Sequence, residues 1–400
     1  MRCLFLIAAL QLAAAGDGST PLLTASYSDD LPAAEALIRG GADANGANDL
    51  GATPLWAACQ NGSVAMVEKL LAAGARPDAA LLSGETPLMV AARGGNAEIV
   101  GLLLGRKADA NKTATRRQTA LMWAVAQGHP EVVKLLLAHG ANVHARSETW
   151  SQVMAVPPHG YPPYNKAIPH GHDTALLFAA RAGGLASAKL LLASGANAND
   201  ADAWGVSALT LAAHSGFGDI VDLLLAHKAD ANAAPAGFTA LHIAILRRDE
   251  KMAAALLAHG ANPSTPLTTW TPTRRSSKDL HFPPALTGAT PFWLAARYLL
   301  PDVMRLLVQL GADPKFVHQS HTVTEGLFEK RVRSSTALLA ALGKGGGGPA
   351  WREPPSEQRE ALILQTVKAA VELGVDRGGA REAARSLGFK KVVKFLEGNQ

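Results

Sequence analysis

The residues of this 400-residue chain whose side chains are best suited to chemistry are histidines that lie between apolar segments. His170 and His172 are separated by one residue, and His318 and His321 by two, so either pair could present two imidazoles to one metal ion. No carboxylate lies at a diagnostic spacing from them. We therefore predict no metal and no cofactor. The alternative is a metal-binding or enzymatic protein that uses these loop histidines.

Three basic clusters and one glycine run could, in principle, bind phosphate or nucleic acid. The clusters are scattered and interleaved with acidic residues, so we interpret them as solvated surface and expect no nucleic-acid partner, although the two in loops could steer an acidic partner. The Gly345–Pro349 run is not followed by Gly-Lys-Ser/Thr, which favours a flexible linker over a phosphate-binding loop. The clusters are Arg274-Arg275-Lys278, Lys330-Arg331-Arg333 and Lys390-Lys391-Lys394.

The composition excludes several classes of protein. With 48% hydrophobic and 18% charged residues, the chain can bury a large core and is not disordered as a whole. Aromatic residues are only 5%, which favours many small helix–helix contacts over a β-sandwich. The two cysteines, Cys3 and Cys59, exclude a disulfide-stapled scaffold and any zinc site that needs several cysteines.

The N-terminal segment has the features of an export signal. Met1-Arg2 supplies a positive charge, the stretch Cys3–Ala15 is apolar apart from Gln11, and Ala13–Ala15 suits a signal peptidase. We predict a signal peptide over residues 1–15, with cleavage near Ala15, and a periplasmic or extracellular location. The competing interpretation is a buried cap helix at the start of the array. No other segment is long and apolar enough to predict a membrane span, so we expect a soluble mature chain.

A three-residue phrase, Thr or Ser followed by Pro or Ala and then Leu or Phe, recurs along the chain. Successive intervals are 33, 33, 33, 55, 33, 32, 51 and 46 residues, so insertions interrupt a 33-residue period three times. A second phrase, most often Gly-Ala-Asp or Gly-Ala-Asn, follows 21 residues after the first. The first phrase begins at Thr20, Thr53, Thr86, Thr119, Thr174, Ser207, Thr239, Thr290 and Thr336.

Each unit predicts two short helices. In the second unit, Thr53 is a helix N-cap and Pro54 occupies the first helical position, where its missing N–H costs nothing. Gly62 ends the first helix and Gly74 the second. One face of the second helix is apolar at helical spacing, through Val64, Val67, Leu70 and Leu71.

These residues resemble the ankyrin repeat family. The segment Thr239–Ala244 comes closest to that family's Thr-Pro-Leu-His-x-Ala signature, and the resemblance covers about residues 19–400. It implies an all-α solenoid of nine full repeats and a terminal one near 379, forming a single domain over 16–400. Histidine at the fourth signature position occurs only at His242. Asp29, Arg248 and Leu299 replace the glycine between the helices, so we expect those units to be less regular.

Three insertions, at residues 146–172, 264–289 and 315–335, fall at the same point of the repeat, after the Gly-Ala-Asx phrase. A fourth, at 343–356, separates the two helices of the ninth unit. The first three should leave the array from its loop side and cluster on one face, where long aromatic loops often bind partners. The candidate partner contacts are Trp150, Tyr161, Tyr164, Trp270, Arg274, Arg275, Phe282, Phe316 and Phe328.

Taken together, these patterns predict an exported, monomeric ankyrin-type solenoid with no catalytic role, which binds another protein through its concave and loop-bearing face. Function follows only weakly from the fold, since the repeat consensus residues are structural. Besides the metal-binding or enzymatic alternative, a purely structural spacer is the third class.

Overall fold

The computed structural model describes residues 17–155, 162–271, 282–323, 328–344 and 356–398. The predicted signal peptide, residues 1–15, lies outside these ranges. The chain divides into two compact units. Unit 1 runs up to Thr149 and includes Gly171–Asn197, and unit 2 consists of Trp150–His170 and the chain from Ala198 onward. Within the described ranges, no helix combines the length and the apolar character needed to cross a bilayer.

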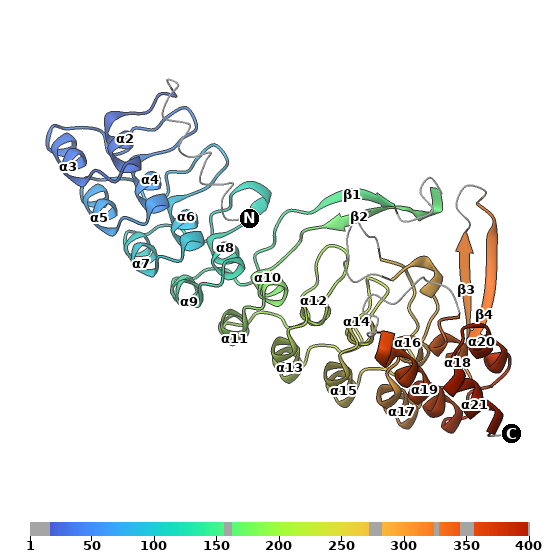
Figure 1. Cartoon of the computed structure of the whole chain (residues 1–400). Coiled ribbons are helices and arrows are strands. Elements are labelled where there is room, and N and C mark those ends of the chain that lie inside the picture. The colour runs from blue at the N-terminus through green and yellow to red at the C-terminus, as the bar shows by residue number, and fades with distance from the viewer. Residues whose placement is uncertain (1–16, 156–161, 272–281, 324–327, 345–355, 399–400) are drawn as a thin grey trace. The chain divides into compact units, whose positions relative to one another are not determined.

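The described part of unit 1 contains five helix pairs, with the first helices in one row and the second helices in another (Figure 1). The first helices are α2 (Pro21–Tyr27), α4 (Pro54–Asn61), α6 (Pro87–Gly94), α8 (Ala120–Ala126) and α10 (Ala175–Ala182). The second helices are α3 (Leu31–Arg39), α5 (Val64–Ala72), α7 (Ala97–Gly105), α9 (Pro130–Ala138) and α11 (Leu185–Ala193). A short 3-10 helix, η2, spans Thr115–Arg117.

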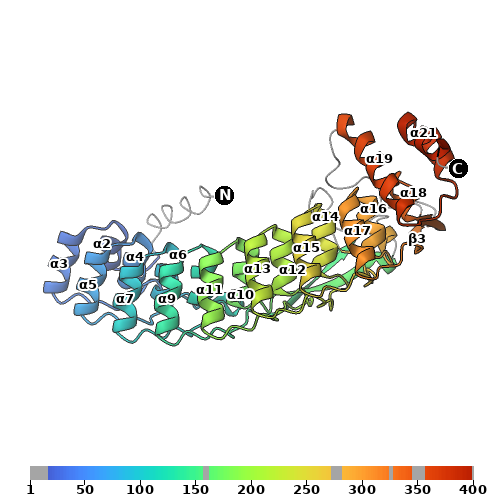
Figure 2. The same cartoon turned by 90° about the horizontal axis from the view of Figure 1, so that it is seen from below.

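Five further helix pairs make up the described helices of unit 2. The first helices are α12 (Ala208–Ser215), α14 (Ala240–Arg247), α16 (Pro291–Arg297), α18 (Ala337–Ala341) and α20 (Ala380–Ser386). The second helices are α13 (Gly218–Ala226), α15 (Glu250–Ala258), α17 (Pro301–Gln309), α19 (Ser356–Glu372) and α21 (Lys390–Gly398). Helix α19 contacts α17, α18 and α21 at the C-terminal end (Figure 2).

Side-chain caps begin most of the first helices. Thr53 is representative, since its Oγ1 accepts a hydrogen bond from the Trp56 N–H and Pro54 follows at the first helical position. The same bond to the third helical residue is made by Thr20, Thr86, Thr119, Ser207, Thr239, Thr290 and Thr336. Thr174 differs, because its buried side chain makes no cap bond. The recurring phrase is therefore a helix-start signal.

The connection between the two helices of a pair passes through the left-handed region of backbone conformation. Glycine does this in most repeats, and Gly62 has φ 73°. Asp29, Arg248 and Leu299 adopt the same conformation with φ of 55°, 59° and 60°. At Arg248 the expectation of a less regular unit was wrong, since the helices beside it keep eight and nine residues. The first helices before Asp29 and Leu299 have seven residues, as α8 has before Gly128. Packing of the neighbouring helices outweighs a local cost of about 1–2 kcal/mol.

The core lies between the two rows of helices and between successive repeats. Leu55, Val67 and Leu70 are fully buried in the second repeat. Between repeats, asparagines join successive loops: Asn45 donates to the Gly74 carbonyl at 3.1 Å and accepts from the Arg76 N–H at 2.8 Å. Because each module covers the apolar face of the next, the helical array has the predicted all-α repeat fold.

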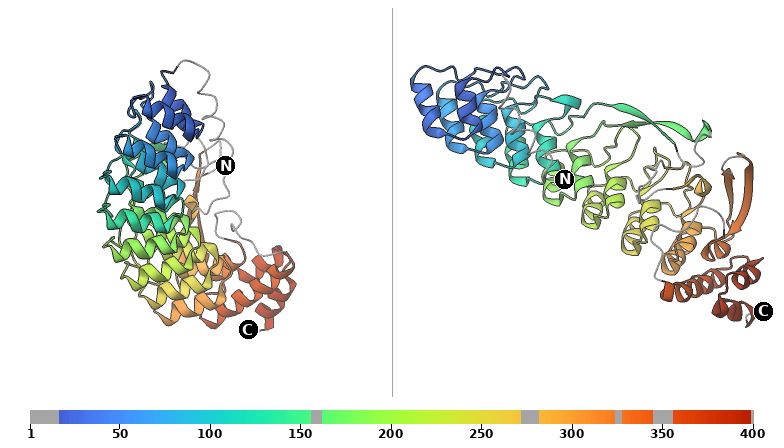
Figure 3. Two further views of the ribbon diagram at one scale, coloured as in Figure 1. Left: turned by 90° about the vertical axis from the view of Figure 1, so that its left-hand side faces the viewer. Right: turned by 45° about the horizontal axis from the view of Figure 1, so that its top comes forward.

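Strands occur in two of the insertions, which the sequence analysis did not predict. Strands β1 (Trp150–Ala155) and β2 (Asn165–His170) pair antiparallel, with Trp150 opposite His170. Strands β3 (Val317–Val323) and β4 (Lys330–Thr336) do the same, with His318 opposite Ser335. The 3-10 helix η3 (Pro162–Tyr164) precedes β2, and η4 (Pro284–Leu286) lies in the second insertion. Both hairpins stand on the loop side of the unit 2 helices (Figures 1 and 3).

Candidate partner-binding face

The root of the β3–β4 hairpin is buried against α16. His318 is almost fully buried, and its Nε2 donates to the Ala285 carbonyl at 2.9 Å, so the neutral ring carries its proton on Nε2. Its ring lies 4.5 Å from the ring of Trp293, whose Nε1 donates to the Ser335 carbonyl at 3.1 Å. Burial lowers the pKa of His318, which the Ala285 hydrogen bond partly opposes, and the nearby charges of His321 and Arg297 lower it further. The hairpin is therefore held by a neutral imidazole and a buried indole.

The second insertion is closed at its base by backbone hydrogen bonds. The Leu267 N–H donates to the Ala289 carbonyl at 2.9 Å, and the Thr271 N–H donates to the Phe282 carbonyl at 3.0 Å. The Thr268 N–H donates to the Gly237 carbonyl of the preceding repeat loop at 2.9 Å. Both described ends of this insertion are thus held on the loop side of the repeats.

His242 of α14 links its repeat to the same insertion. Its Nδ1 accepts from the Thr239 N–H at 3.1 Å, which completes a reciprocal cap, and its ring lies edge-on to that of Phe282. Complete burial lowers the pKa of His242 to about 4. The one signature histidine therefore joins helix α14 to the inserted segment.

The β1–β2 hairpin contacts the second insertion through one face. Lys166 donates to Thr269 Oγ1 at 3.0 Å, and its ammonium group lies 4.7 Å from the centre of the Trp270 ring. On the same face of the hairpin, Ile168 is buried and Trp150 stacks on His170 with the ring centres 4.4 Å apart.

These contacts join the insertions of unit 2 in a chain. The β1–β2 hairpin meets the second insertion at Trp270, and the second insertion meets the β3–β4 hairpin at Ala285. The prediction that the insertions lie on one side is confirmed for these segments. We call the described parts of 150–170, 264–289 and 315–336 the insertion face.

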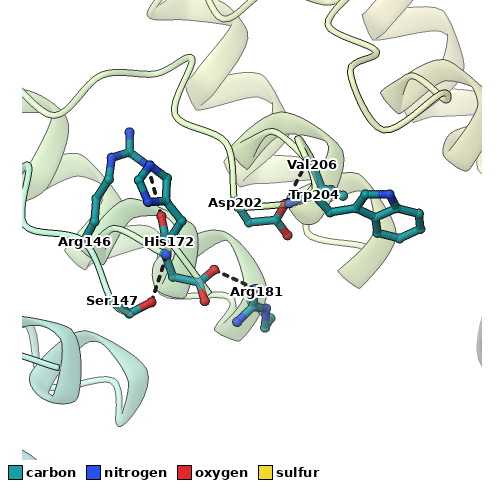
Figure 4. A network of polar contacts seen from close by, with 8 residues as sticks. Arg146, Ser147, His172, Arg181, Asp202, Trp204 and Val206 are labelled. Carbon is teal, nitrogen blue, oxygen red and sulfur yellow. Dashed lines mark hydrogen bonds and ion pairs between the residues drawn. The ribbon is translucent and has the colours of Figure 1, made fainter. Parts of the chain in front are cut away.

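In unit 1, polar contacts close the base of the first insertion (Figure 4). Arg146 donates to the His172 carbonyl at 3.0 Å, and the Asp173 N–H donates to Ser147 Oγ at 3.0 Å. Arg181 pairs with Asp173 at 2.9 Å. A side chain on Gly171 would overlap the Glu148 carbonyl, so only glycine fits this crossing. Figure 4 also shows a separate turn of unit 2, where Asp202 accepts from the N–H groups of Trp204 and Val206 at 2.9 Å each.

The predicted partner contacts differ in how exposed they are. Trp150 and Phe328 are exposed, 37% and 40%, and Phe316 is half-buried. Trp270 and Phe282 are buried, so they support the insertion face from below and do not reach a partner; a loop position in the sequence does not reveal the neighbours that cover a ring. Tyr164 ends η3. The remaining three, Tyr161, Arg274 and Arg275, lie outside the described residues.

The two histidines of each predicted pair make different contacts in the structure. His318 and His321 are three residues apart on β3, so their side chains leave opposite faces of the hairpin. Only the first of them is buried. His170 is stacked on Trp150, and His172 offers its carbonyl to Arg146. Across the described ranges, no three His, Cys, Asp or Glu side chains gather as a metal site.

The sequence analysis missed the exposed apolar residues of the hairpins. Val153 is 71% exposed and Val332 is 56% exposed, each on the open face of its hairpin. The sequence offered little signal for these strands, because the β-branched residues over 317–323 and 330–336 do not alternate regularly with polar ones.

The three insertions at 146–172, 264–289 and 315–335 also hold the net charge of the protein. They contain nine Lys and Arg but four Asp and Glu, out of 38 and 33 in the whole chain. The rest of the chain has 29 of each, so the formal net charge of +5 resides in the insertions. Among the described residues of the insertion face, Lys166, Lys315, Lys330, Arg331 and Arg333 are cationic and Glu329 is acidic, so this face suits an acidic partner.

Comparisons with known proteins agree with the repeat architecture. A family model described as ankyrin repeats, in three copies, matches residues 3–80, 77–147 and 171–266. Among solved structures, the crystal structure of the human ASB11 ankyrin repeat domain is similar, with a TM-score of 0.50 and 26% sequence identity. That match covers 62% of this chain and 100% of the other. No curated protein sequence matches the chain.

Proposed function

Because the chain belongs to the ankyrin repeat family, whose repeats are generally protein–protein interaction modules, we propose that it is a non-catalytic module that binds another protein through its insertion face. Stacked repeats offer extended surfaces on which side chains and loops can vary without loss of the fold. The insertions depart from the repeat pattern at the points where such loops emerge, and they are the segments in which a specific partner site is expected.

One observation carries this proposal: the insertions of unit 2 contact one another and stand on buried side chains. Trp270, Phe282 and His318 form a supporting layer, and Val153 and Val332 lie exposed above it. Ordered loops lose less conformational entropy on binding than free ones. A partner bound on this face would remove both exposed valines from water, which favours binding.

A photo-crosslinking experiment tests the proposal. The photoreactive residue p-benzoylphenylalanine replaces Val153 or Val332 in the full chain, and Asp222 or Lys251 in matched controls on the exposed side of helices α13 and α15. We expect both insertion-face positions to crosslink to the same partner in the cell and the helix positions not to do so. Crosslinks to that partner from the helix positions alone would show that the binding face lies elsewhere.

We propose that this binding takes place after export, as a monomer, which residues 1–15 support by their signal-like pattern. Mass spectrometry of the crosslinked material reads the mature N-terminus directly. A chain that begins at Gly16 agrees with export, and a chain that retains Met1–Ala15 contradicts it.

A further inference from the structure

Strand β4 is an exposed strand with an open edge. Its residues Lys330–Ser334 are all exposed, and only Ser335 and Thr336 at its end are buried. Within the described part of the chain, β4 pairs with β3 alone, so its other edge has no strand beside it. The hairpin projects beyond the helices (Figure 1). A strand edge of this kind offers N–H and C=O groups to an added strand.

The edge of β4 is cationic on both faces of the hairpin. Arg331 and Arg333 share the face of His318, while Lys330 shares the opposite face with Val332. Arg331 pairs with Glu329 at 3.5 Å, and both side chains are more than half exposed, so this ion pair is weak and can exchange for a partner's carboxylate. A strand added along β4 therefore meets positive charge whichever way its side chains point.

The hairpin presents this edge from a firm root. His318 and Ser335, a cross-strand pair, are both buried, and Trp293 hydrogen-bonds to the Ser335 carbonyl. Because the root holds the strand in place before binding, β4 loses little conformational entropy when a partner strand is added.

From these observations we propose that β4 binds an extended acidic segment of the partner protein by antiparallel or parallel strand addition, with carboxylates on that segment meeting Lys330, Arg331 and Arg333. The inference rests on the proposed function and names the chemistry of the partner. A polypeptide is favoured over nucleic acid for two reasons. The strand edge can hydrogen-bond to a peptide backbone. The same hairpin also exposes the apolar side chains of Val332 and Val317, whereas a surface that binds nucleic acid needs more cations to contact phosphates.

The test uses the full chain and a fluorescein-labelled peptide of alternating Glu and Thr, with fluorescence anisotropy as the readout. The variant K330E/R331E/R333E reverses the three charges on β4. Its matched control, K390E/K391E/K394E, makes the same change in net charge on the exposed side of α21. We expect the β4 variant to raise Kd at least about tenfold and the α21 variant to leave it near the wild-type value. The β4 variant should gain affinity for the corresponding Lys-Thr peptide.

Hydrogen exchange separates strand addition from simple charge attraction. Binding of the Glu-Thr peptide should slow exchange of amides within 330–334, because half of them acquire carbonyl partners. Equal loss of binding in both variants, unchanged exchange in β4, or tighter binding of a single-stranded DNA oligonucleotide than of the peptide would each overturn the inference. Crosslinking from Val153 that persists in such a case would leave the proposed function standing and reject only the strand-addition site.

Discussion

The β1–β2 and β3–β4 hairpins enter at the same point of the repeat, but they differ in how they are held and in what they present. The root of β3–β4 packs on fully buried Trp293 through His318. The β1–β2 hairpin has one buried side chain on its inner face, Ile168, and is otherwise held by Lys166 over Trp270 and by the partly exposed Trp150. Burial is the stronger means of attachment, since it removes apolar surface from water, whereas an exposed cation–π contact contributes about 0.5–1 kcal/mol.

Their open faces differ as well. The open face of β1–β2 carries Ser151, Val153 and Ala167 and has no charge, while Lys330 and Val332 lie on that of β3–β4 and two arginines on its other side. The comparison teaches that a firmly held insertion can expose charge, because its folding does not depend on the exposed residues. We therefore expect β3–β4 to select the partner and β1–β2 to add apolar contact area.

A single position of the repeat holds the two later insertions. His242 and Trp293 each occupy the fourth position of the signature phrase, three residues after the N-cap threonine. The first contacts Phe282, and the second contacts Ser335 and His318. The side chain at this position thus reaches the inserted segment that follows, and at His242 it also completes the helix cap.

The largest expected effect is on stability, and it distinguishes the attachment of the β3–β4 hairpin from that of the β1–β2 hairpin. Trp293→Ala removes a fully buried indole and the hydrogen bond to Ser335, so we expect a loss of about 3–5 kcal/mol in the free energy of unfolding. Trp150→Ala, at the partly exposed start of β1, should cost about 1 kcal/mol or less. Urea unfolding followed by circular dichroism measures both, with hydrogen exchange over 317–323 as a local readout. Equal losses in the two variants would contradict the assignment of unequal attachment.

A smaller effect is a loss of folding stability at acidic pH. His242 has a pKa of about 4 in the folded chain against 6.5 when unfolded, so between these values the unfolded state binds more protons than the folded state. Stability is full above pH 6.5 and falls as the pH drops towards 4, by up to about 3 kcal/mol from this residue. Burial of His318 lowers its pKa and acts in the same direction.

Urea unfolding at several pH values measures that slope. His242→Gln keeps an acceptor for the Thr239 N–H but does not titrate, so it should flatten the dependence between pH 6.5 and 4. His139→Gln, at an exposed helix end, is the control and should leave the slope intact. A slope that persists in His242→Gln would assign the acid sensitivity to other groups.

The smallest expected effect tests the attachment of β1–β2. Lys166→Ala removes the cation above Trp270 and the bond to Thr269, and we expect a change below about 1 kcal/mol in global stability. Hydrogen exchange over 150–155 and 165–170 should nevertheless become faster, while 317–323 stays unchanged. Lys166→Arg keeps a cation above the ring and should restore slow exchange. Unaltered exchange in Lys166→Ala would show that this contact does not hold the hairpin.

The sequence by itself determined the repeat array, because its signals are local. Thr53 caps the helix that begins at the next residue, Gly62 ends it, and Val67 and Leu70 repeat at helical spacing, so each helix is specified within a few residues. The same reasoning placed the insertions, since they interrupt a regular period.

Only the tertiary structure decided the character of the insertions. Trp270 and Phe282 are buried while Val332 is exposed, and aromatic or apolar type alone does not separate these outcomes. The deciding contacts join residues far apart in the chain, as when Trp293 reaches Ser335 and Lys166 reaches Thr269. Local pattern is sufficient where a segment makes its own hydrogen bonds, and it fails where burial and strand register depend on which distant segment covers it.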